Sequence, residues 1–437
     1  MRHVPPRQAT LRRPTRVVAS YAASSVATCV ALLIASLAFA APVPAQATAQ
    51  ANARATAQAA APDSADPVAF LVSQLDLERY KATIKGLTAF GDRRQGTARN
   101  RAALDWIEAQ LRSYGCTPER LTYDFTPPPP VQRPAGAGPG QRPATPPRAG
   151  QGGSRLRGNR ARTGVNNDSL AQPDARLREL NAEASVPGQR QNVYCTKVGT
   201  VHPDEMYIVG AHMDGIGWGE AANDDGSGTA LVMELARVFS MPGVTTERTI
   251  RFALWNNEET GLNGARAYIA QRQALQGKEE PAGSGKYPEP RWLGMIQHDM
   301  MLWDHGMPRA DGTLNPEQRP EADVNVEFQS NSKMAEQSAR LAWFFHAANE
   351  KYATDYPATV GPHMTNTDSG PFQDLIASIS LRENERGAHT GAGWNPHWHQ
   401  PTDRYATFSD KDFRLGLNAA QTTLGALGLL AGARVAR

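Results

Sequence analysis

From residue 192 onward, apolar runs of strand length alternate with segments whose apolar residues recur at helical spacing. The runs predict strands at 192–198, 206–211, 249–255, 292–297 and 377–381. The helical spacing predicts helices at 227–239, 261–270, 332–352 and 410–430. Runs such as 207–211 are apolar without alternation, as expected of strands covered on both faces. The pattern therefore predicts an α/β fold: a three-layer α/β/α sandwich with a central mixed, mostly parallel β-sheet.

Upstream of this region the pattern is interrupted once. Leu104, Ile107 and Leu111 recur at helical spacing before Gly115, and a strand pattern follows at 121–125. Residues 126–170 are then rich in Pro, Gly and Arg, a composition that cannot bury enough apolar surface to offset its ordering entropy. We interpret 126–170 as a disordered insertion, between two strands, in a catalytic domain that spans 66–437.

The N-terminus has the order of a secretory signal. Five Arg residues between positions 2 and 16 precede an apolar run at 26–40, and small residues follow. A membrane anchor is the alternative, but the run is shorter than the roughly 20 residues that span a bilayer. The sequence predicts a signal peptide at 1–40, a low-complexity tether at 41–65, and a mature protein without a stable membrane span in the periplasm or outside the cell.

The charge is unevenly distributed. The chain has 46 basic and 43 acidic residues, a formal net charge of +3. Residues 1–62 hold six Arg and residues 126–164 hold seven, with no acidic residue in either segment, so the remainder is net acidic. An acidic folded part disfavours nucleic-acid binding.

Two cysteines remain once the signal is removed, Cys116 and Cys195. Disulfides persist in exported proteins. Cys116 opens one predicted strand, and Cys195 lies inside the next one. We predict that they pair, closing a loop that contributes about 4 kcal/mol by the loop-entropy model. Two buried free thiols are the alternative.

Residue types that bind metals lie at four of the predicted strand ends. His212 and Asp214 end one strand and lie on the same side of an extended chain, so that Asp214 can orient the imidazole. Asp224 and Asp225 enter a Gly/Ser turn before a helix, where two adjacent carboxylates repel each other without a cation. Helix capping by Asp225 or Ser227 is the alternative for that segment.

Further candidates follow the next strands. Glu258 and Glu259 come after the strand 249–255, and paired carboxylates can divide metal binding from general-base work. Asp299 ends the strand 292–297, and a late loop holds His389, His397, His399 and Asp403. Two imidazoles and three carboxylates from these segments suit two zinc ions that share a bridging carboxylate.

Five blocks of this sequence, in order and spacing, resemble metallopeptidase family twenty-eight, the family of secreted di-zinc aminopeptidases that is related to glutamate carboxypeptidases and glutaminyl cyclases. The blocks are Gly210-Ala211-His212-Met213-Asp214, Ala222-Asn223-Asp224-Asp225-Gly226-Ser227-Gly228, Asn257-Glu258-Glu259-Thr260-Gly261-Leu262, His298-Asp299-Met300 and His399-Gln400-Pro401-Thr402-Asp403. The likeness covers about residues 75–430.

The resemblance implies a role for each residue. His212 and Asp299 would be the terminal ligands of one zinc ion, Glu259 and His399 those of the other, and Asp224 would bridge both. Glu258 would be the general base, and Asp214 and Asp225 would support the ligands. The family often has a cis peptide bond after the bridging acid, which here is Asp224-Asp225.

The choice of the late histidine rests on the family spacing. The ligand stands four residues before an acid, which fits His399 and Asp403 and does not fit His397. His298, His363, His389 and His397 are therefore interpreted as structural or pocket-lining. Trp398 stands where the family frequently has Tyr, and Ser369 where it usually has His.

The predicted function is a zinc exopeptidase acting on peptides, and an aminopeptidase is favoured. A carboxypeptidase would need a cation to bind the terminal carboxylate, for which Arg382 and Arg386 are candidates. Glutaminyl cyclases typically keep one zinc and lack the first histidine ligand, so His212 argues against that activity. A non-catalytic binding domain would have lost ligands or the base, and none is missing.

Overall fold

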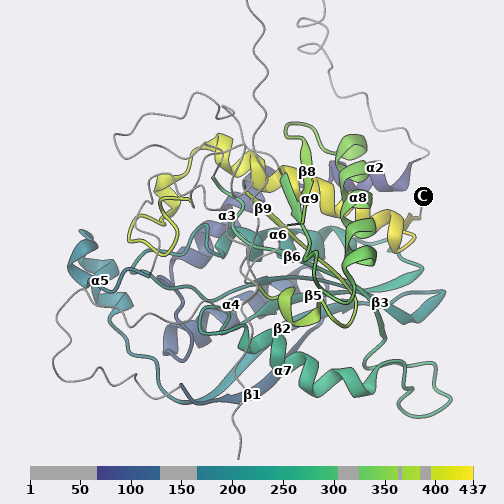
Figure 1. Ribbon diagram of the computed structural model, residues 1–437, viewed down its shortest axis with the longest axis horizontal. Coiled ribbons are helices and arrows are strands. Elements are labelled where there is room, and N and C mark those ends of the chain that lie inside the picture. The colour runs from purple at the N-terminus through teal and green to yellow at the C-terminus, as the bar shows by residue number, and fades with distance from the viewer. Residues whose placement is uncertain (1–65, 128–164, 304–323, 363–366, 384–394, 437) are drawn as a thin grey trace, which may run out of the picture. The chain divides into compact units, whose positions relative to one another are not determined.

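The computed structural model describes residues 66–127, 165–303, 324–362, 367–383 and 395–436 (Figure 1). The signal peptide predicted at 1–40, the tether at 41–65 and most of the insertion predicted at 126–170 lie outside the described residues. The described residues belong to one compact unit within 60–437.

A single eight-stranded sheet organises this unit, in the order β1-β2-β5-β3-β6-β9-β7-β8. Its strands are β1 (Pro118–Phe125), β2 (Gly188–Lys197), β3 (His202–His212), β5 (Arg248–Trp255), β6 (Arg291–His298), β7 (Val324–Glu327), β8 (Ala358–Gly361) and β9 (Ala377–Glu383). Two short strands, β4 (Val244–Thr245) and β10 (Arg434–Val435), pair separately.

The centre of the sheet is parallel. Strand β3 pairs in parallel with β5 on one side and β6 on the other, and β6 pairs in parallel with β9. In the described part of the eight-stranded sheet, the antiparallel pairs are β1 with β2, β2 with β5, and β7 with β9. Because β5, β3, β6 and β9 run in one direction, their carboxyl ends meet at one edge, where α/β proteins assemble their sites.

Helices cover both faces of the sheet. They are α2 (Pro67–Ser73), α3 (Leu77–Thr88), α4 (Ala98–Ser113), α5 (Ala175–Asn181), α6 (Gly226–Phe239), α7 (Asn263–Arg272), α8 (Ala335–Tyr352) and α9 (Asp410–Leu430). Side chains alternate along β5: Phe252 and Leu254 belong to the core that contains α6 and α9, whereas Ala253 and Trp255 belong to the core that contains α7. The predicted three-layer α/β/α sandwich is confirmed.

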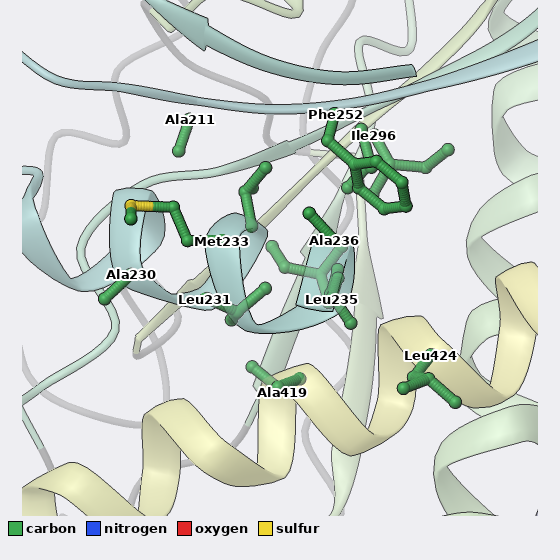
Figure 2. Close-up of a cluster of buried hydrophobic side chains, with 14 of the residues drawn as sticks. Ala211, Ala230, Leu231, Met233, Leu235, Ala236, Phe252, Ile296, Ala419 and Leu424 are labelled. Carbon is green, nitrogen blue, oxygen red and sulfur yellow. The ribbon is translucent and has the colours of Figure 1, made fainter. Parts of the chain in front are cut away.

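The larger core is built around α6. Figure 2 shows that this helix lies between the sheet, represented by Ala211, Phe252 and Ile296, and helix α9, represented by Ala419 and Leu424. A helix enclosed on both sides should be apolar around its circumference, and nearly every residue of α6 is buried. Its first turn is capped by Asp225, whose Oδ1 accepts a hydrogen bond from Gly228 N at 2.9 Å.

The predicted disulfide is present at the β1 edge. Cys116 lies just before β1 and Cys195 lies in β2, and their Cα atoms are 5.8 Å apart. The strands pair so that Pro118 lies opposite Cys195. The bridge therefore ties the chain entering β1 to its neighbouring strand.

Most of the elements predicted from the pattern occur within a few residues of their expected bounds. Helix α9 occupies the predicted 410–430, and α6 extends the predicted 227–239 by one residue. The hydrophobic pattern did not predict α2, α3, α5, β7 or β8, which are short or weakly patterned. In the part of the chain that the structure describes, none of the helices has the length and apolarity needed to cross a bilayer.

Candidate metal centre

The candidate residues gather at the carboxyl edge of the parallel strands. His212 is the last residue of β3, Glu258 and Glu259 follow β5, and Asp299 follows β6. Asp224 precedes the first turn of α6, which packs against the sheet beside these strands. His399 comes from the loop before α9. Side chains from segments far apart in the sequence thus lie together at the carboxyl edge of the parallel strands.

Asp224 lies between the two predicted histidine ligands. Its Oδ1 is 3.2 Å from His212 Nε2, and its Oδ2 is 3.0 Å from His399 Nε2. His212 Nε2 is also 3.8 Å from Asp299 Oδ1, and His399 Nε2 is 2.8 Å from Glu259 Oε2. One carboxylate therefore faces two imidazoles, and the same Nε2 atom of each imidazole lies near a second carboxylate.

Glu258 lies next to this arrangement. Its carboxylate, His212 and Asp299 have potential ligand atoms within 4.8 Å of one another, and so do His212, Asp224 and Glu259. The peptide N–H of Glu258 donates to Asp214 Oδ1 at 3.0 Å. Asp214 thus anchors the loop that carries the two glutamates.

The ring orientation of His212 is set by the backbone. Its Nδ1 is 2.9 Å from the carbonyl oxygen of Asp214, while the Asp214 carboxylate is 3.9 Å away. A carbonyl oxygen only accepts, so Nδ1 donates to it, and Nε2 is the ring nitrogen that faces Asp224. Asp214 thus orients the imidazole through its main chain, whereas the sequence analysis expected its side chain to do so.

Two further acids fix the backbone around Asp224. Asp225 Oδ2 accepts from His212 N at 3.1 Å, and its Oδ1 accepts from Met300 N at 3.2 Å, so this one side chain joins β3, α6 and the segment after β6. Asp403 accepts from Asn223 N and Asp224 N. The peptide bond between Asp224 and Asp225 is cis, as the resemblance implies.

The electrostatics reflect a concentration of negative charge. Burial raises the pKa of Glu259 to about 7, although His399 acts against the shift. Burial also raises the pKa of Glu258 well above its usual value, and the neighbouring charges of Glu259, Asp368 and Asp299 add to the shift. Asp224 is the exception: hydrogen bonds from His212 and His399 overcome the effect of burial and lower its pKa.

This donor set fits divalent zinc. It offers imidazole nitrogens and carboxylate oxygens, which zinc prefers, in two groups that share Asp224. The buried atoms of the described residues that have no hydrogen-bond partner include Glu259 Oε1 and His399 Nδ1 at this site. Carboxylates this close together need a compensating cation.

The other histidines have different surroundings. His298 is fully buried between Gly210 O and Thr423 Oγ1, and burial lowers its pKa to about 3. The Nδ1 of His397 lies 2.8 Å from Thr402 Oγ1. Neither approaches Asp224 as His399 does. His363 and His389 lie outside the described residues. Trp398 stacks on the His399 ring with the centroids 4.0 Å apart.

Several contacts at the site have no local sequence signal. Arg382 of β9 forms an ion pair with Asp299. The adjacent Glu383 accepts hydrogen bonds from Asn223, from Asn395 and from the peptide N–H of Leu302. Arg93 is fully buried and donates to main-chain carbonyls of described residues, including those of Met213 and Ala221. Strand order and long-range packing bring these residues together.

The model of peptidase family M28 matches residues 192–421 of this chain. This match covers more than half of the chain and includes all the residues that line the candidate centre. The chain belongs to peptidase family M28.

Curated relatives match over shorter stretches. Aminopeptidase YwaD of Bacillus subtilis is 41% identical over 68 residues, which are 16% of this chain and 14% of that protein. Carboxypeptidase Q of Mus musculus is 30% identical over 96 residues, 22% of this chain and 20% of that protein. The chain thus spans a fifth or less of the length of these relatives.

Solved structures resemble the fold over most of the chain. The aminopeptidase from Aneurinibacillus sp. strain AM-1 superposes with a TM-score of 0.51 at 20% identity, covering 84% of this chain and 96% of that one. A glutaminyl cyclase of Porphyromonas gingivalis superposes with a TM-score of 0.50 at 15% identity, covering 82% and 99%. At these identities the likeness establishes the fold.

Proposed function

We propose that this protein is a zinc-dependent exopeptidase, an aminopeptidase that removes N-terminal residues from peptides. The observation that carries the proposal is the position of Asp224, whose two oxygens face Nε2 of His212 and Nε2 of His399. A carboxylate placed between two imidazoles is suited to bridge two metal ions.

The proposed centre would hold two zinc ions. His212 and Asp299 would hold one ion, Glu259 and His399 would hold the other, and both ions would share Asp224. Bound zinc would polarise the scissile carbonyl and lower the pKa of the attacking water. The tautomer of His212, with its proton on Nδ1, leaves Nε2 available as a ligand.

Glu258 acts as the general base in this proposal. Its carboxylate takes a proton from the attacking water and returns it to the leaving amine. Its half-buried position beside Glu259 and Asp299 raises its pKa, which suits a group that must both accept and release a proton. The hydrogen bond from its own N–H to Asp214 holds it in place.

The environment of Arg382 favours an aminopeptidase over a carboxypeptidase. Arg382 was one of two candidates to bind a terminal carboxylate, yet its side chain is only 4% exposed and is paired with Asp299. A cation committed to a buried acid is poorly placed to bind a substrate carboxylate. The other candidate, Arg386, lies outside the described residues.

We also propose that the protein is exported, to the periplasm or beyond. The signal-like order of residues 1–40 and the disulfide between Cys116 and Cys195 support this, because disulfides persist in oxidising compartments. A relative of Mycobacterium tuberculosis that is 40% identical over 92 residues bears the name probable lipoprotein aminopeptidase LpqL.

The decisive experiment compares one leucine-containing peptide with a free N-terminus and with an acetylated N-terminus, using zinc-loaded protein. The proposal expects cleavage of the free peptide only, with a loss of at least about 100-fold in Glu258→Gln. Cleavage of the acetylated peptide would instead point to carboxypeptidase or endopeptidase action. Glu205→Gln is the matched control, since Glu205 lies near the opposite end of β3 and pairs with Arg248 and Arg291.

A further inference from the structure

Arg382 has an unusual place among the cations of this protein. Of the Arg and Lys residues that the structure describes, it alone forms an ion pair with a proposed zinc ligand. Its Nη2 is 2.5 Å from Asp299 Oδ2, and both side chains are 4% exposed. A buried pair of this kind lacks the solvent screening that weakens surface ion pairs.

The pair divides the two oxygens of Asp299 between different partners. Oδ2 accepts from Arg382, whereas Oδ1 is 3.8 Å from Nε2 of His212. Of the two Asp299 oxygens, Oδ1 is therefore the one that faces His212 Nε2, next to Asp224 Oδ1. Asp299 is presented to His212 through one oxygen, and its other oxygen already has a partner.

The main chain reinforces this arrangement. Asp299 N donates to Leu381 O at 3.2 Å, and Glu383 N donates to Met300 O at 2.8 Å. These two hydrogen bonds extend the pairing of β6 with β9 past His298 and align Asp299 and Arg382 side by side. The ion pair is thus formed between residues whose backbones are held in register.

We propose that Arg382 is a positioning residue for the metal centre: it would hold Asp299 so that this residue presents only Oδ1, beside His212, as a ligand atom. This inference rests on the proposed function, because it assumes that Asp299 binds zinc. The guanidinium stays charged at every pH at which the protein is folded and donates along fixed directions, which suits it to hold one carboxylate oxygen. Groups that orient metal ligands in this way typically change metal affinity 10- to 100-fold when removed.

The test is zinc affinity, measured at each of the two sites by competition with a chromogenic chelator, for wild type, Arg382→Met and Arg382→Lys. The inference expects Arg382→Met to weaken one zinc ion about 10- to 100-fold and to leave the second within about threefold. Arg382→Lys keeps the charge on a shorter, less directional group. Its affinity for the weakened zinc ion should lie between those of wild type and Arg382→Met.

Arg251→Met controls for the loss of any buried ion pair. Arg251 Nη1 is 2.5 Å from Glu289 Oε2, with side chains 2% and 0% exposed, and Glu289 is no proposed ligand. This variant should lose thermal stability and keep both zinc affinities. If Arg382→Met gives no folded protein, Arg382→Lys decides alone: a selective weakening of one ion supports the inference, and unchanged binding overturns it.

The remaining outcomes are also informative. Unchanged or tighter zinc binding in Arg382→Met would mean that the arginine does not position Asp299, and parallel weakening of both ions would indicate a general structural role. Either result overturns the inference while leaving the proposed function intact. A wild-type protein that bound no zinc would overturn both.

Discussion

Asp403 holds the main chain at Asp224 with both of its carboxylate oxygens. Oδ1 accepts from Asn223 N at 2.8 Å, and Oδ2 accepts from Asp224 N at 3.0 Å. Asp224 and Asp403 are 179 positions apart in the sequence. Asp403 lies four residues after His399, so the segment that contributes one proposed ligand also fixes the backbone of the ligand that both ions would share.

Asp403→Asn should therefore weaken zinc binding about 10- to 100-fold, because an amide cannot accept through both of its polar atoms. Both ions should be affected, since Asp224 is shared. Chelator competition measures the effect. Asp374→Asn is the control, because Asp374 also accepts a peptide N–H, from Lys333, but on an exposed turn. Equal affinities in Asp403→Asn and wild type would contradict the assigned role.

The two neighbouring histidines should differ sharply when replaced. His399→Ala removes a proposed ligand and should lower the zinc content from two ions to one and peptide cleavage by at least about 100-fold. His397→Ala should retain both ions, because His397 contacts Thr402 and the rings of Trp303 and Phe408. The zinc content of the two gel-filtered variants, measured by mass spectrometry, distinguishes the two histidines. Loss of an ion in His397→Ala alone would reverse the assignment.

The buried carboxyl of Glu383 should make the metal-free protein less stable as the pH rises. Burial raises its pKa from 4.5 to about 7, although the amides of Asn395 and Asn223 act against the shift. Between these values the folded state binds more protons than the unfolded state, so the free energy of unfolding falls with pH, by about 3 kcal/mol at most from this group.

Urea unfolding at pH 5 and pH 8, with a chelator present, measures this dependence for wild type and Glu383→Gln. The variant should show a smaller loss of stability between the two pH values. Glu336→Gln serves as the control, because the Glu336 side chain is 77% exposed. An identical pH dependence in wild type and Glu383→Gln would exclude Glu383 as a source of the effect.

Zinc removal should destabilise the folded state. The proposed ligands bring like charges together, and a ligand that binds only the native state stabilises it by about 2.7 kcal/mol at 100 times its dissociation constant. Differential scanning fluorimetry should show a lower Tm after chelation and its recovery when zinc is added back. In Asp224→Asn the zinc-dependent increase in Tm should be strongly reduced. A Tm independent of zinc in wild type would argue against the centre.

Opening the disulfide should lower stability without dismantling the site. The bridge closes a loop with a sequence separation of 79 residues, which is worth about 4 kcal/mol in the loop-entropy model. The Cys116→Ala/Cys195→Ala double variant should unfold at lower urea yet bind zinc with unchanged affinity. Thiol titration of the denatured chain without residues 1–40 should find no free thiol in wild type.

The sequence was most informative where chemistry and local pattern coincide. Apolar runs located the central strands, and the polar residues directly after them identified His212, Glu259 and Asp299 as neighbours at one edge. Family spacing favours His399 over His397, and His399 lies 3.0 Å from Asp224 and 2.8 Å from Glu259; its role as a ligand stays a prediction. These conclusions needed only the direction of the strands and the positions of a few residues.

Other features depended on the tertiary arrangement. Nothing near Asp299 in the sequence identifies Arg382 as its partner, because the two are 83 residues apart and meet only through the pairing of β6 with β9. The side-chain role expected of Asp214 is filled by its carbonyl group, since local backbone geometry determines which oxygen reaches His212. Helix α3 had a usable signal in Tyr80, Ile84 and Leu87 behind the capping residue Asp76, which the pattern analysis passed over.

The antiparallel pairing of β1 with β2 has a practical consequence for protein engineering. Phe125 lies opposite Gly188, so the chain leaves and re-enters the sheet at adjacent points on its outer edge. Residues 165–181 return along the metal centre, where Asn166 N donates to His399 O and Gln172 binds Trp218 O. The stretch 126–164 is therefore a natural place for a reporter domain or an affinity tag, whereas additions after Val165 would disturb the support of a proposed ligand.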